Sequence, residues 1–565
     1  MIRNIIPAKA QFQINEMLTF EVDADPEFCA ADTIKIQVFR MGRLCFEKEK
    51  AIAARLRFQY LPPRAPGNME GFWVCAAQRH GDAVVSRKAT ACDRAASWSC
   101  APRYGFLSDF GREELRDDRD VRRMNQYHLN VIQFYDWMYR HHDYFPPQSD
   151  FRDVMGKESS MDTVKEKIGQ LHRYGMKAFA YGAVYGAEEE YDGAEPTCAL
   201  RDNQKRVMRL IDRIIYMDIH RGTQWHEDII AQYRKAMAFG FDGIHMDQYG
   251  GPKEAYAIEN GKYVLRNLRD DFPVLIDDVK EALGESGVIF NAVNNWPVDT
   301  AAKSREDCVY IEVWPPNDTY ADLNRLISDA KKYAPEKQVI LAAYLLPFAK
   351  CEQPETMLCT ALLAMATIFS SGGFHLLLGE ENGMLTQAYY SDYCRVQNAD
   401  FIGCLQNYYD FITAYEELLF GFDLVDDTRA YTGGINEEYC FFGAEFSTVP
   451  QSGCVWTQVK QTGAYKIVQL VNFCGVETMV WNSAHGKLPD VQHGIRVNAL
   501  VVEEIEEIYL ASPDIGDGAS QKLEFAVTVR ADGQKVVDFA VPELRVWDMI
   551  YMKTRVNEDS EENGN

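Results

Sequence analysis

Positive charge is scarce in this sequence. The chain holds 59 Lys and Arg residues against 84 Asp and Glu residues, which gives a formal net charge of −25 at pH 7. Proteins that bind nucleic acid or an anionic membrane neutralise phosphate groups with clustered Lys and Arg. The shortage therefore argues against nucleic acid and against a membrane as the main partner.

Long hydrophobic runs are missing as well. A helix that spans a bilayer needs about 20 consecutive apolar residues, and the most apolar stretch, Met357 to Ser371, is interrupted by Thr360 and Thr367. The apolar stretch from Met1 to Ala8 is too short for a signal peptide. These features predict a cytoplasmic protein, with secretion as the alternative if a leader has been removed.

Cofactor and metal motifs are also lacking. The 14 cysteines show no CxxC pair and no regular spacing, which favours reduced, mostly buried thiols over a disulfide framework or a zinc site. A phosphate-binding loop rich in glycine, with a nearby Lys, is not present. His245 and Asp247, with His141 or His142, are an alternative metal site, but the histidines lie on different predicted strands without a ligand motif. We therefore expect no metal and no cofactor.

The chain length predicts several domains. A chain of 565 residues exceeds what one hydrophobic core usually supports, and two to four domains are expected. Residues 1–93 read as short strands separated by Gly, Pro, Asn and Asp, which predicts an N-terminal immunoglobulin-like β-sandwich. Residues 431–556 predict a C-terminal β-sandwich, and the acidic residues 557–565 predict a disordered tail. The predicted outer strands are 11–22, 33–40, 53–60, 71–78 and 82–89, then 439–446, 464–473, 496–502, 506–511, 522–530 and 536–552.

Strand and helix patterns alternate between residues 94 and 430, which predicts a central (β/α)8 TIM barrel. The long interval from Gly186 to Trp225 predicts an inserted loop at the barrel mouth. The predicted barrel strands are 104–110, 130–138, 177–185, 240–249, 288–296, 307–314, 338–345 and 374–379. The predicted helices are 112–126, 161–174, 225–239, 259–283, 319–332, 355–370 and 401–420.

Two of the predicted strands end in an acid. The stretch Phe241–Gly250 delivers Asp247, and the stretch Cys308–Pro316 delivers Glu312. Active sites of this fold are built from the carboxyl ends of the strands, so both carboxylates are expected in one mouth. Two carboxylates that face each other are the basic apparatus of glycosidic bond cleavage. Asp242 lies an odd number of residues before Asp247, so its side chain points to the opposite face of the strand, and we expect it to be structural.

Carboxylates, amides and aromatic rings recur at the other strand ends. This mixture suits sugars, because polar groups bind hydroxyls and flat rings contact the C–H face of a sugar. Asp109, Gln133, Tyr185, Asn291, Asn295 and His375 also lie at these ends. The predicted substrate-binding residues are Asp136, Tyr135, Trp137, His141, Tyr181, His245, Gln248, Asn294, Trp296, Trp314, Tyr344 and Glu380.

Several of these stretches together resemble glycoside hydrolase family 66, the dextranases and cycloisomaltooligosaccharide glucanotransferases. Gly240–Gly250 resembles the family's nucleophile strand, and Tyr310–Pro315 resembles its acid/base strand. Further similar stretches follow in the family's order: Val131–His141, Phe290–Asn295 and His375–Leu385. The resemblance covers the barrel and extends more weakly into both flanking regions.

The resemblance implies retaining hydrolysis of α-1,6-glucosidic linkages in dextran or isomaltooligosaccharides, without a metal. It implies that Asp247 is the nucleophile, that Glu312 is the general acid and then the general base, and that Asp136 binds sugar hydroxyls. Transglycosylation to cyclic or longer isomaltooligosaccharides is the first alternative, and a non-catalytic carbohydrate-binding relative is the second. The sequence shows no carbohydrate-binding module inserted in the barrel, which favours hydrolysis. Endo or exo mode, chain-length preference and oligomeric state stay open.

Overall fold

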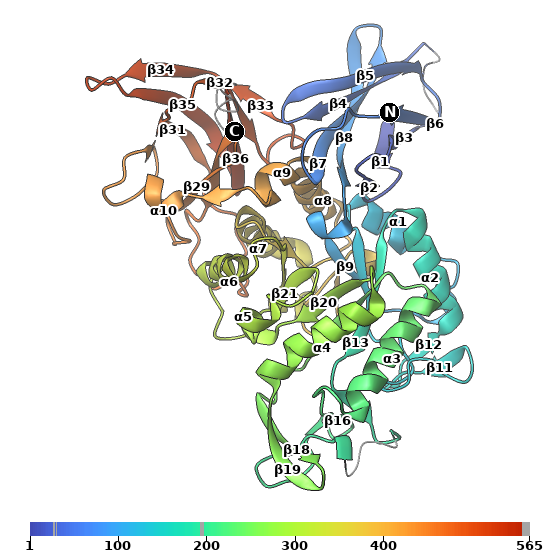
Figure 1. The fold of residues 1–565 in the computed structure, drawn as a ribbon. Helices are drawn as coiled ribbons and strands as arrows, with labels where there is room; N and C mark the ends of the chain where they lie inside the picture. The colour runs from blue at the N-terminus through green and yellow to red at the C-terminus, as the bar shows by residue number, and fades with distance from the viewer. Residues whose placement is uncertain (26–28, 30, 192–196, 556–565) are drawn as a thin grey trace, which may run out of the picture.

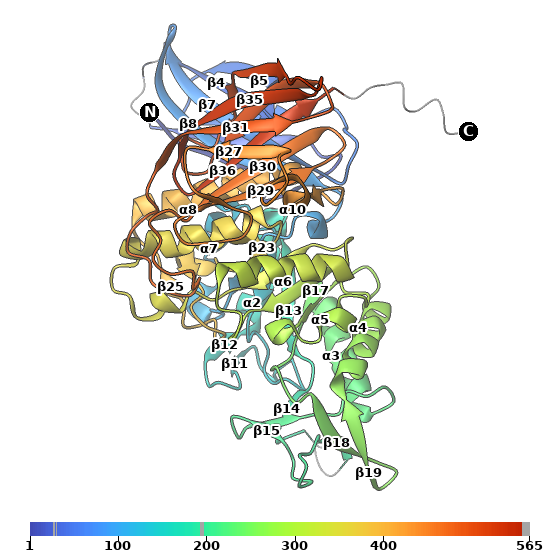
Figure 2. The same ribbon diagram turned by 90° about the vertical axis from the view of Figure 1, so that its left-hand side faces the viewer.

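The protein is multidomain, with a central barrel and β-rich parts at both ends of the chain (Figure 1). This computed structural model describes residues 1–25, 29, 31–191 and 197–555. The two β-rich parts lie on the same side of the barrel, and a hairpin of β18 (Glu254–Glu259) and β19 (Lys262–Asn267) projects on the opposite side (Figures 1 and 2). The predicted tail 557–565 lies outside the described residues.

The N-terminal part consists of two sheets, ordered β1-β3-β6 and β2-β8-β7-β4-β5. Along β4, Ile34, Ile36 and Val38 are buried while their neighbours are not, so every second side chain enters a core shared by both sheets. The immunoglobulin-like topology and the domain limits stay predictions. The strands are β1 (Ile2–Pro7), β2 (Phe12–Gln13), β3 (Leu18–Ala24), β4 (Thr33–Arg40), β5 (Arg43–Ala51), β6 (Arg55–Tyr60), β7 (Met69–His80) and β8 (Ala83–Ala95).

The barrel is an eight-stranded parallel sheet, ordered β23-β22-β21-β20-β17-β13-β10-β9. A parallel bridge between Phe106 and Gly379 joins its two edges, so the sheet is nearly closed, and all eight predicted strands are confirmed. The strands are β9 (Tyr104–Leu107), β10 (Val131–Phe134), β13 (Lys177–Ala183), β17 (Gly243–Asp247), β20 (Gly287–Asn291), β21 (Cys308–Glu312), β22 (Val339–Ala342) and β23 (Phe374–His375).

Local signals in the sequence set several helix ends. Thr319 and Asp322 form a reciprocal capping box at the start of α6, and Gly240, with a φ of 127°, ends α3. Helix α7 is buried on nearly all sides, because it packs against α6, α8 and β30 of the C-terminal part. The helices are α1 (Arg119–Gln126), α2 (Met161–Arg173), α3 (Gln224–Phe239), α4 (Leu268–Leu283), α5 (Val298–Ala301), α6 (Tyr320–Tyr333), α7 (Leu358–Ser370), α8 (Ala399–Ala414), α9 (Glu416–Phe420) and α10 (Thr428–Tyr431).

The predicted helix 259–283 is wrong over its first residues. Residues 259–267 belong to the β18–β19 hairpin, and α4 begins only at Leu268. Asn260 and Gly261 connect the two strands with φ values of 50° and 74°. Asn-Gly is a strong signal for a two-residue hairpin turn, and here it outweighs the helical pattern.

The interval 186–225 contributes β14 (Gly186–Glu188), β15 (Arg209–Leu210) and β16 (Ile214–Tyr216), which form a small antiparallel sheet. The predicted insertion is therefore confirmed in the described residues. β11 (Asp150–Arg152) and β12 (Glu158–Ser160) form a second short hairpin after β10. A third pair, β24 (Gly383–Met384) and β25 (Cys394–Arg395), follows β23.

The C-terminal part also consists of two sheets, which share one core. The prediction missed β29, which pairs with β30 along seven residues of each strand. The strands are β26 (Val425–Asp426), β27 (Tyr439–Phe442), β28 (Phe446–Ser447), β29 (Val455–Gln461), β30 (Tyr465–Asn472), β31 (Gln492–Leu500), β32 (Ile505–Ala511), β33 (Gln521–Leu523), β34 (Phe525–Val529), β35 (Lys535–Leu544) and β36 (Trp547–Thr554).

Two chain-wide properties follow from the described residues. Every cysteine among them is a free thiol. None of the helices that the structure describes is long and apolar enough to cross a membrane.

A buried ion cluster joins the N-terminal part to the barrel. The Arg103 guanidinium donates to Asp93 Oδ1 at 2.8 Å and to Glu416 Oε2 at 3.3 Å. It also donates to the carbonyls of His128 and Ala10. The side chains of the arginine and both acids are at most 1% exposed. Such a cluster tolerates the loss of one member poorly, because the remaining charges stay buried without a partner.

Replacing Arg103 with Met is expected to destabilise the protein by about 3–5 kcal/mol, because Asp93 and Glu416 lose their countercharge. The matched control is Arg55→Met, which removes the exposed ion pair of Arg55 with Asp23 and should cost less than about 1 kcal/mol. Chemical denaturation followed by tryptophan fluorescence measures both variants. Equal destabilisation by the two substitutions would contradict the role given to Arg103.

Candidate active site

A cleft of about 830 Å³ opens at the carboxyl ends of the barrel strands. Leu210, Ile211 and Ile214 from the inserted segment form part of its wall, as the sequence predicts for that interval. Concave sites of this size, with convergent polar groups, are typical of small-molecule and sugar binding. The predicted site residues that line the cleft are Tyr135, Asp136, His141, Tyr181, His245, Asp247, Gln248, Asn294, Glu312, Trp314 and Tyr344.

Asp247 and Glu312 are joined by one amide. Asn291, the last residue of β20, places its Nδ2 atom 2.7 Å from Asp247 Oδ1 and 3.1 Å from Glu312 Oε2. An amide nitrogen has two hydrogens that diverge by about 120°, and two linear hydrogen bonds from them correspond to a separation of about 5 Å between the acceptor oxygens. Tyr181 donates to the second oxygen of Asp247 at 2.8 Å, and Tyr344 donates to the second oxygen of Glu312 at 2.9 Å. Both carboxylates are therefore fixed in place.

Burial controls the protonation of this pair. It raises the pKa of Asp247 to about 7, with the charge of Glu312 as the second cause. Burial also raises the pKa of Glu312, while the hydrogen bonds from Asn291 and Tyr344 oppose that rise. Two close carboxyls in a buried site do not both ionise readily. The pair therefore keeps one proton near neutral pH.

Replacing Asn291 with Ala is expected to lower kcat by about 10²- to 10³-fold, the usual effect of removing one preorganised donor. The substitution also removes hydrogen bonds that favour the ionised form of both carboxyls, so both pKa values rise. Both limbs of the pH profile of kcat/KM should therefore move to higher pH.

The matched control is Asn294→Ala. Asn294 lies three residues further along the chain, in the turn after β20, but its amide donates to the Pro315 carbonyl and accepts from Asn317. This control should leave both pH limbs in place. A pH profile of Asn291→Ala that superimposes on that of the wild type would remove Asn291 from this role.

His245 lies below the carboxylates as a neutral ring. Burial lowers its pKa to about 3. Its Nδ1 atom lies 3.0 Å from the Tyr104 hydroxyl, and its ring packs edge-on against Tyr310 at 4.7 Å. A neutral imidazole packed among tyrosines supports the base of the cleft rather than supplying a charge.

Asp136 has the backbone geometry of a functional residue. Its φ of 48° is rare for a residue other than glycine, and such strain concentrates at active sites. Burial raises the pKa of its carboxyl to about 6. Asp136 lines the cleft beside Tyr135, which is a position suited to accepting hydrogen bonds from sugar hydroxyls.

His141 and His142 both bind Glu188, a residue that the sequence reasoning missed. The Nδ1 atoms of the two rings lie 2.7 and 2.8 Å from the two oxygens of Glu188. Glu188 belongs to β14, in the inserted segment, and no motif marks it. The alternative of a metal site with His245 and Asp247 is not supported, because the one grouping of three ligand atoms among the described residues lies elsewhere.

Aromatic side chains form the rim of the cleft. Trp314 is 38% exposed and packs edge-on against Tyr344. Tyr390 stacks on Tyr135 with a centroid distance of 4.4 Å and places its hydroxyl 3.1 Å from that of Tyr310. Sequence reasoning missed Tyr389 and Tyr390, which lie between β24 and β25, after the last barrel strand. The only signal for them is the adjacent pair of tyrosines.

Three predicted site residues do not line the cleft. Trp137 is fully buried, and its indole donates to the Tyr181 carbonyl at 3.1 Å. Trp296 packs on Phe272, and the Lys253 ammonium lies over its ring. Glu380 is buried and accepts hydrogen bonds from the Ser108 hydroxyl and from the backbone of Ser108 and Asp109. All three support the walls of the barrel.

Two further side chains at the strand ends, one amide and one acid, make structural contacts. Gln248 lines the cleft, but its amide donates to the Trp296 carbonyl and accepts from the Gly250 backbone. Asp242 accepts from His172, Lys177 and the Ala178 backbone. The structural role predicted for Asp242 is confirmed.

Known proteins with similar sequences are sugar-active enzymes. A cycloisomaltooligosaccharide glucanotransferase of Niallia circulans is 24% identical over 714 residues, covering 98% of this chain and 72% of that protein. A second one from the same organism is 23% identical and covers 80% of this chain. A dextranase of Streptococcus salivarius is 26% identical over 547 residues, covering 83% of this chain. The chain spans 62% and 66% of the lengths of these last two relatives.

The fold has a close counterpart among solved structures. A cycloisomaltooligosaccharide glucanotransferase of Paenibacillus sp., complexed with cycloisomaltoheptaose, superimposes with a TM-score of 0.87 at 21% identity. The superposition covers 98% of this chain and 99% of the other. The model of glycosyl hydrolase family 66 matches residues 7–551. Because this match includes the barrel, the cleft and both β-rich parts, the chain belongs to glycosyl hydrolase family 66.

Proposed function

We propose that the protein is a retaining glycoside hydrolase that cleaves α-1,6-glucosidic linkages of dextran or isomaltooligosaccharides. The observation that carries this proposal is the Asn291 amide, which lies within hydrogen-bond distance of both Asp247 and Glu312. Two hydrogen bonds from one amide nitrogen correspond to an oxygen separation of about 5 Å. Retaining enzymes need a separation of about 5–5.5 Å, whereas inverting enzymes leave about 6.5–9.5 Å for a water molecule. The geometry supports a double displacement.

Asp247 is suited to the role of nucleophile. Tyr181 and Asn291 each donate to one of its oxygens, and both bonds favour the ionised carboxylate. Attack on the anomeric carbon forms a covalent glucosyl-enzyme, and the bond to the leaving sugar oxygen breaks. The Tyr181 hydroxyl keeps the attacking oxygen oriented, which lowers the cost of reaching the transition state.

Glu312 is suited to the role of acid and base. In the first step its proton passes to the leaving oxygen. In the second step the Glu312 carboxylate takes a proton from water, and the resulting nucleophile releases the sugar from Asp247. Burial raises the pKa of both carboxyls, so the pair can share one proton, and the double displacement uses that proton on Glu312 while Asp247 attacks as the carboxylate.

Substrate contacts are assigned from the cleft wall. Trp314 offers an exposed face for a glucosyl ring. Asp136 offers a carboxylate for hydroxyl groups beside the catalytic pair. The substrate class itself is inferred from the relatives, which are named for isomaltooligosaccharides and dextran.

Transglycosylation to cyclic or longer isomaltooligosaccharides is the second candidate. The observation that favours it is the likeness to glucanotransferases, including the superposed Paenibacillus enzyme. Water and a sugar hydroxyl compete for the same covalent intermediate, so one site serves both reactions. A non-catalytic carbohydrate-binding role is disfavoured, since a binding protein has no use for a fixed and protonated carboxyl pair.

The test is incubation with dextran and with isomaltooligosaccharides of defined length, with the products resolved by size and linearity. The control is Asp247→Ala, which lacks the proposed nucleophile. Linear products that only the wild type makes support the hydrolase, and cyclic products support the glucanotransferase. Proton NMR identifies the anomeric configuration of the product when it first forms. A β-anomer at early times would overturn the retaining mechanism.

A further inference from the structure

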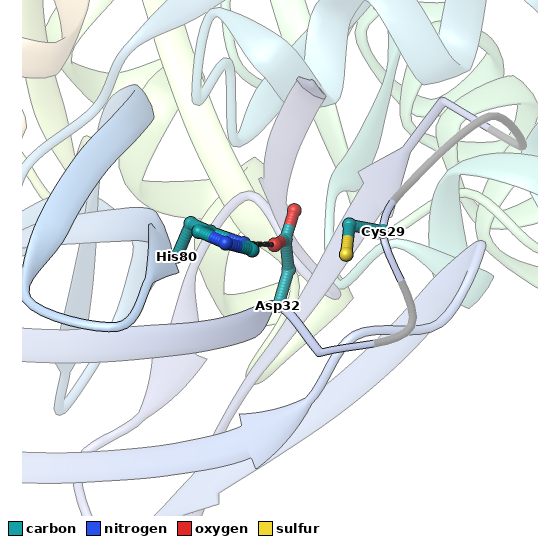
Figure 3. Close-up of side chains that lie close together, drawn as sticks. All are labelled: Cys29, Asp32 and His80. Atoms are coloured by element: carbon teal, nitrogen blue, oxygen red, sulfur yellow. Dashed lines mark hydrogen bonds and ion pairs between the residues drawn. The ribbon is translucent and has the colours of Figure 1, made fainter.

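A cluster of three different metal-ligand side chains lies in the N-terminal part, away from the cleft. Cys29, Asp32 and His80 each offer a ligand atom, and these atoms all lie within 4.8 Å of one another. Figure 3 shows Asp32 between the imidazole of His80 and the thiol of Cys29. We propose that Cys29, Asp32 and His80 bind a zinc ion.

The backbone brings these residues together. Strands β4 and β7 pair in antiparallel register, with Thr33 opposite Arg79. Asp32 and His80 are the next residues outward on the two strands, so the register places them opposite each other. The Asp32 amide donates to the Cys29 carbonyl at 2.9 Å, and this bond holds Cys29 near the pair. The cluster therefore rests on a paired strand end.

The ligand set matches zinc chemistry. Thiolate, imidazole and carboxylate are all zinc ligands, with bonds of about 2.0–2.3 Å, and the soft thiolate disfavours magnesium or calcium. Bonds of that length place tetrahedral ligand atoms about 3–4 Å apart. His80 Nδ1 and Asp32 Oδ1 are 2.7 Å apart, and all three ligand atoms lie within 4.8 Å of one another. Zinc binding therefore requires the first two atoms to separate slightly and the thiol to approach them.

The surroundings provide what a metal site needs. Asp32 is only 5% exposed, and Gln78 donates to its second oxygen at 2.6 Å. This hydrogen bond orients the carboxylate, as donors behind a metal ligand do. Cys29 is exposed, and the His80 side chain is 60% exposed. An ion can therefore enter from solvent, and water supplies the fourth ligand.

Zinc binding to the cluster releases a proton. Zinc replaces the thiol proton of Cys29, the ring proton of His80 moves to Nε2 so that Nδ1 can bind the ion, and no electron is transferred. Affinity should therefore fall as the pH falls. The ion would connect Cys29 and Asp32, which precede β4, to His80 at the end of β7, so the expected benefit is stability of the N-terminal part.

The first test uses the full-length protein after treatment with a chelator. Cobalt(II) is added in steps, and the near-ultraviolet charge-transfer absorption between thiolate and cobalt is recorded. We expect saturation at one equivalent and loss of the absorption when zinc is added. The absence of this absorption in the wild type would overturn the proposal.

Variants assign the absorption to the cluster. Cys29→Ser and His80→Ala should each weaken cobalt binding by about tenfold or more. The matched control is Cys45→Ser, because Cys45 is also an exposed thiol of the same part of the chain and should leave the absorption intact. An absorption that persists in Cys29→Ser, or disappears in Cys45→Ser, means adventitious binding at another thiol and overturns the proposal.

A thermal readout is independent of cobalt. Zinc in excess should raise the unfolding temperature of the wild type, because a ligand that binds only the folded state stabilises it. The shift should vanish in His80→Ala, which keeps every cysteine. An equal shift in wild type and His80→Ala would contradict the proposed site. Because Cys29 and His80 are exposed, Cys29→Ser and His80→Ala are expected to fold. Circular dichroism of both variants without metal checks this.

Discussion

Replacing Asp247 with alanine is expected to lower kcat on α-1,6-glucan by about 10⁴-fold or more, as loss of a covalent nucleophile does in other enzymes. The variant keeps Asn291, Glu312 and the cleft, but no atom remains to form the glucosyl-enzyme. Removal of a buried carboxyl whose pKa is raised by burial should leave the fold at least as stable near neutral pH. Initial rates and the unfolding temperature measure the two effects separately.

A small external nucleophile separates the chemical role of Asp247 from general damage. Azide fits the space that the alanine leaves and attacks an activated aryl isomaltooligosaccharide from the face that Asp247 occupied. The expected product is the β-glucosyl azide, since a single displacement inverts the anomeric carbon. Turnover near the wild-type level without azide, or an α-azide as the product, would assign the nucleophile to another residue.

The barrel was predictable because its signals are local and repeated. Each strand is a short apolar run followed by polar chain, and eight such runs alternate with helical patterns. The parity rule also placed Asp247 and Glu312 correctly in the cleft, because β17 and β21 continue as regular strands up to these residues.

The rule that side chains alternate along a strand failed where the backbone adopts the left-handed conformation, with a positive φ. Regular alternation would put Trp137 on the same face as Tyr135. Asp136 between them has a φ of 48°, and the alternation ends there. Trp137 consequently points into the core. Trp296 follows Asn294 and Asn295, with φ values of 52° and 66°, and turns away from the cleft for the same reason. A position near a strand end therefore does not by itself place a side chain in the cleft.

The contacts that make the site work were beyond sequence reasoning. Asn291 was one of several amides at strand ends, and its bond to two carboxylates depends on side-chain rotamers from three neighbouring strands. Glu188 reaches His141 and His142 from an inserted segment, and no spacing in the sequence connects these residues. The hairpin at Asn260 and Gly261 is different, because the Asn-Gly pair is a local signal for the turn that is present in the sequence.

Replacing Glu312 with Gln is expected to lower kcat on α-1,6-glucan by about 10²- to 10⁴-fold, the usual contribution of general acid and base catalysis. The loss should depend on the leaving group. A sugar alkoxide needs the proton of Glu312, whereas an activated phenolate does not. With an aryl isomaltooligosaccharide the first step should stay fast, the second should lack its base, and a burst of phenolate should precede a slow steady state.

The pH profile gives an independent measure of the same residue. In the wild type, activity should fall as the pH rises through about 7, where the coupled pair loses its last proton. Burial raises both pKa values, so ionisation of the second carboxyl is what removes the acid. Glu312→Gln has no proton to lose, and its profile with the aryl substrate should stay flat above pH 7. An alkaline limb that persists in Glu312→Gln would show that a different group is the acid, and Asp136, whose pKa burial raises to about 6, would be the next residue to replace.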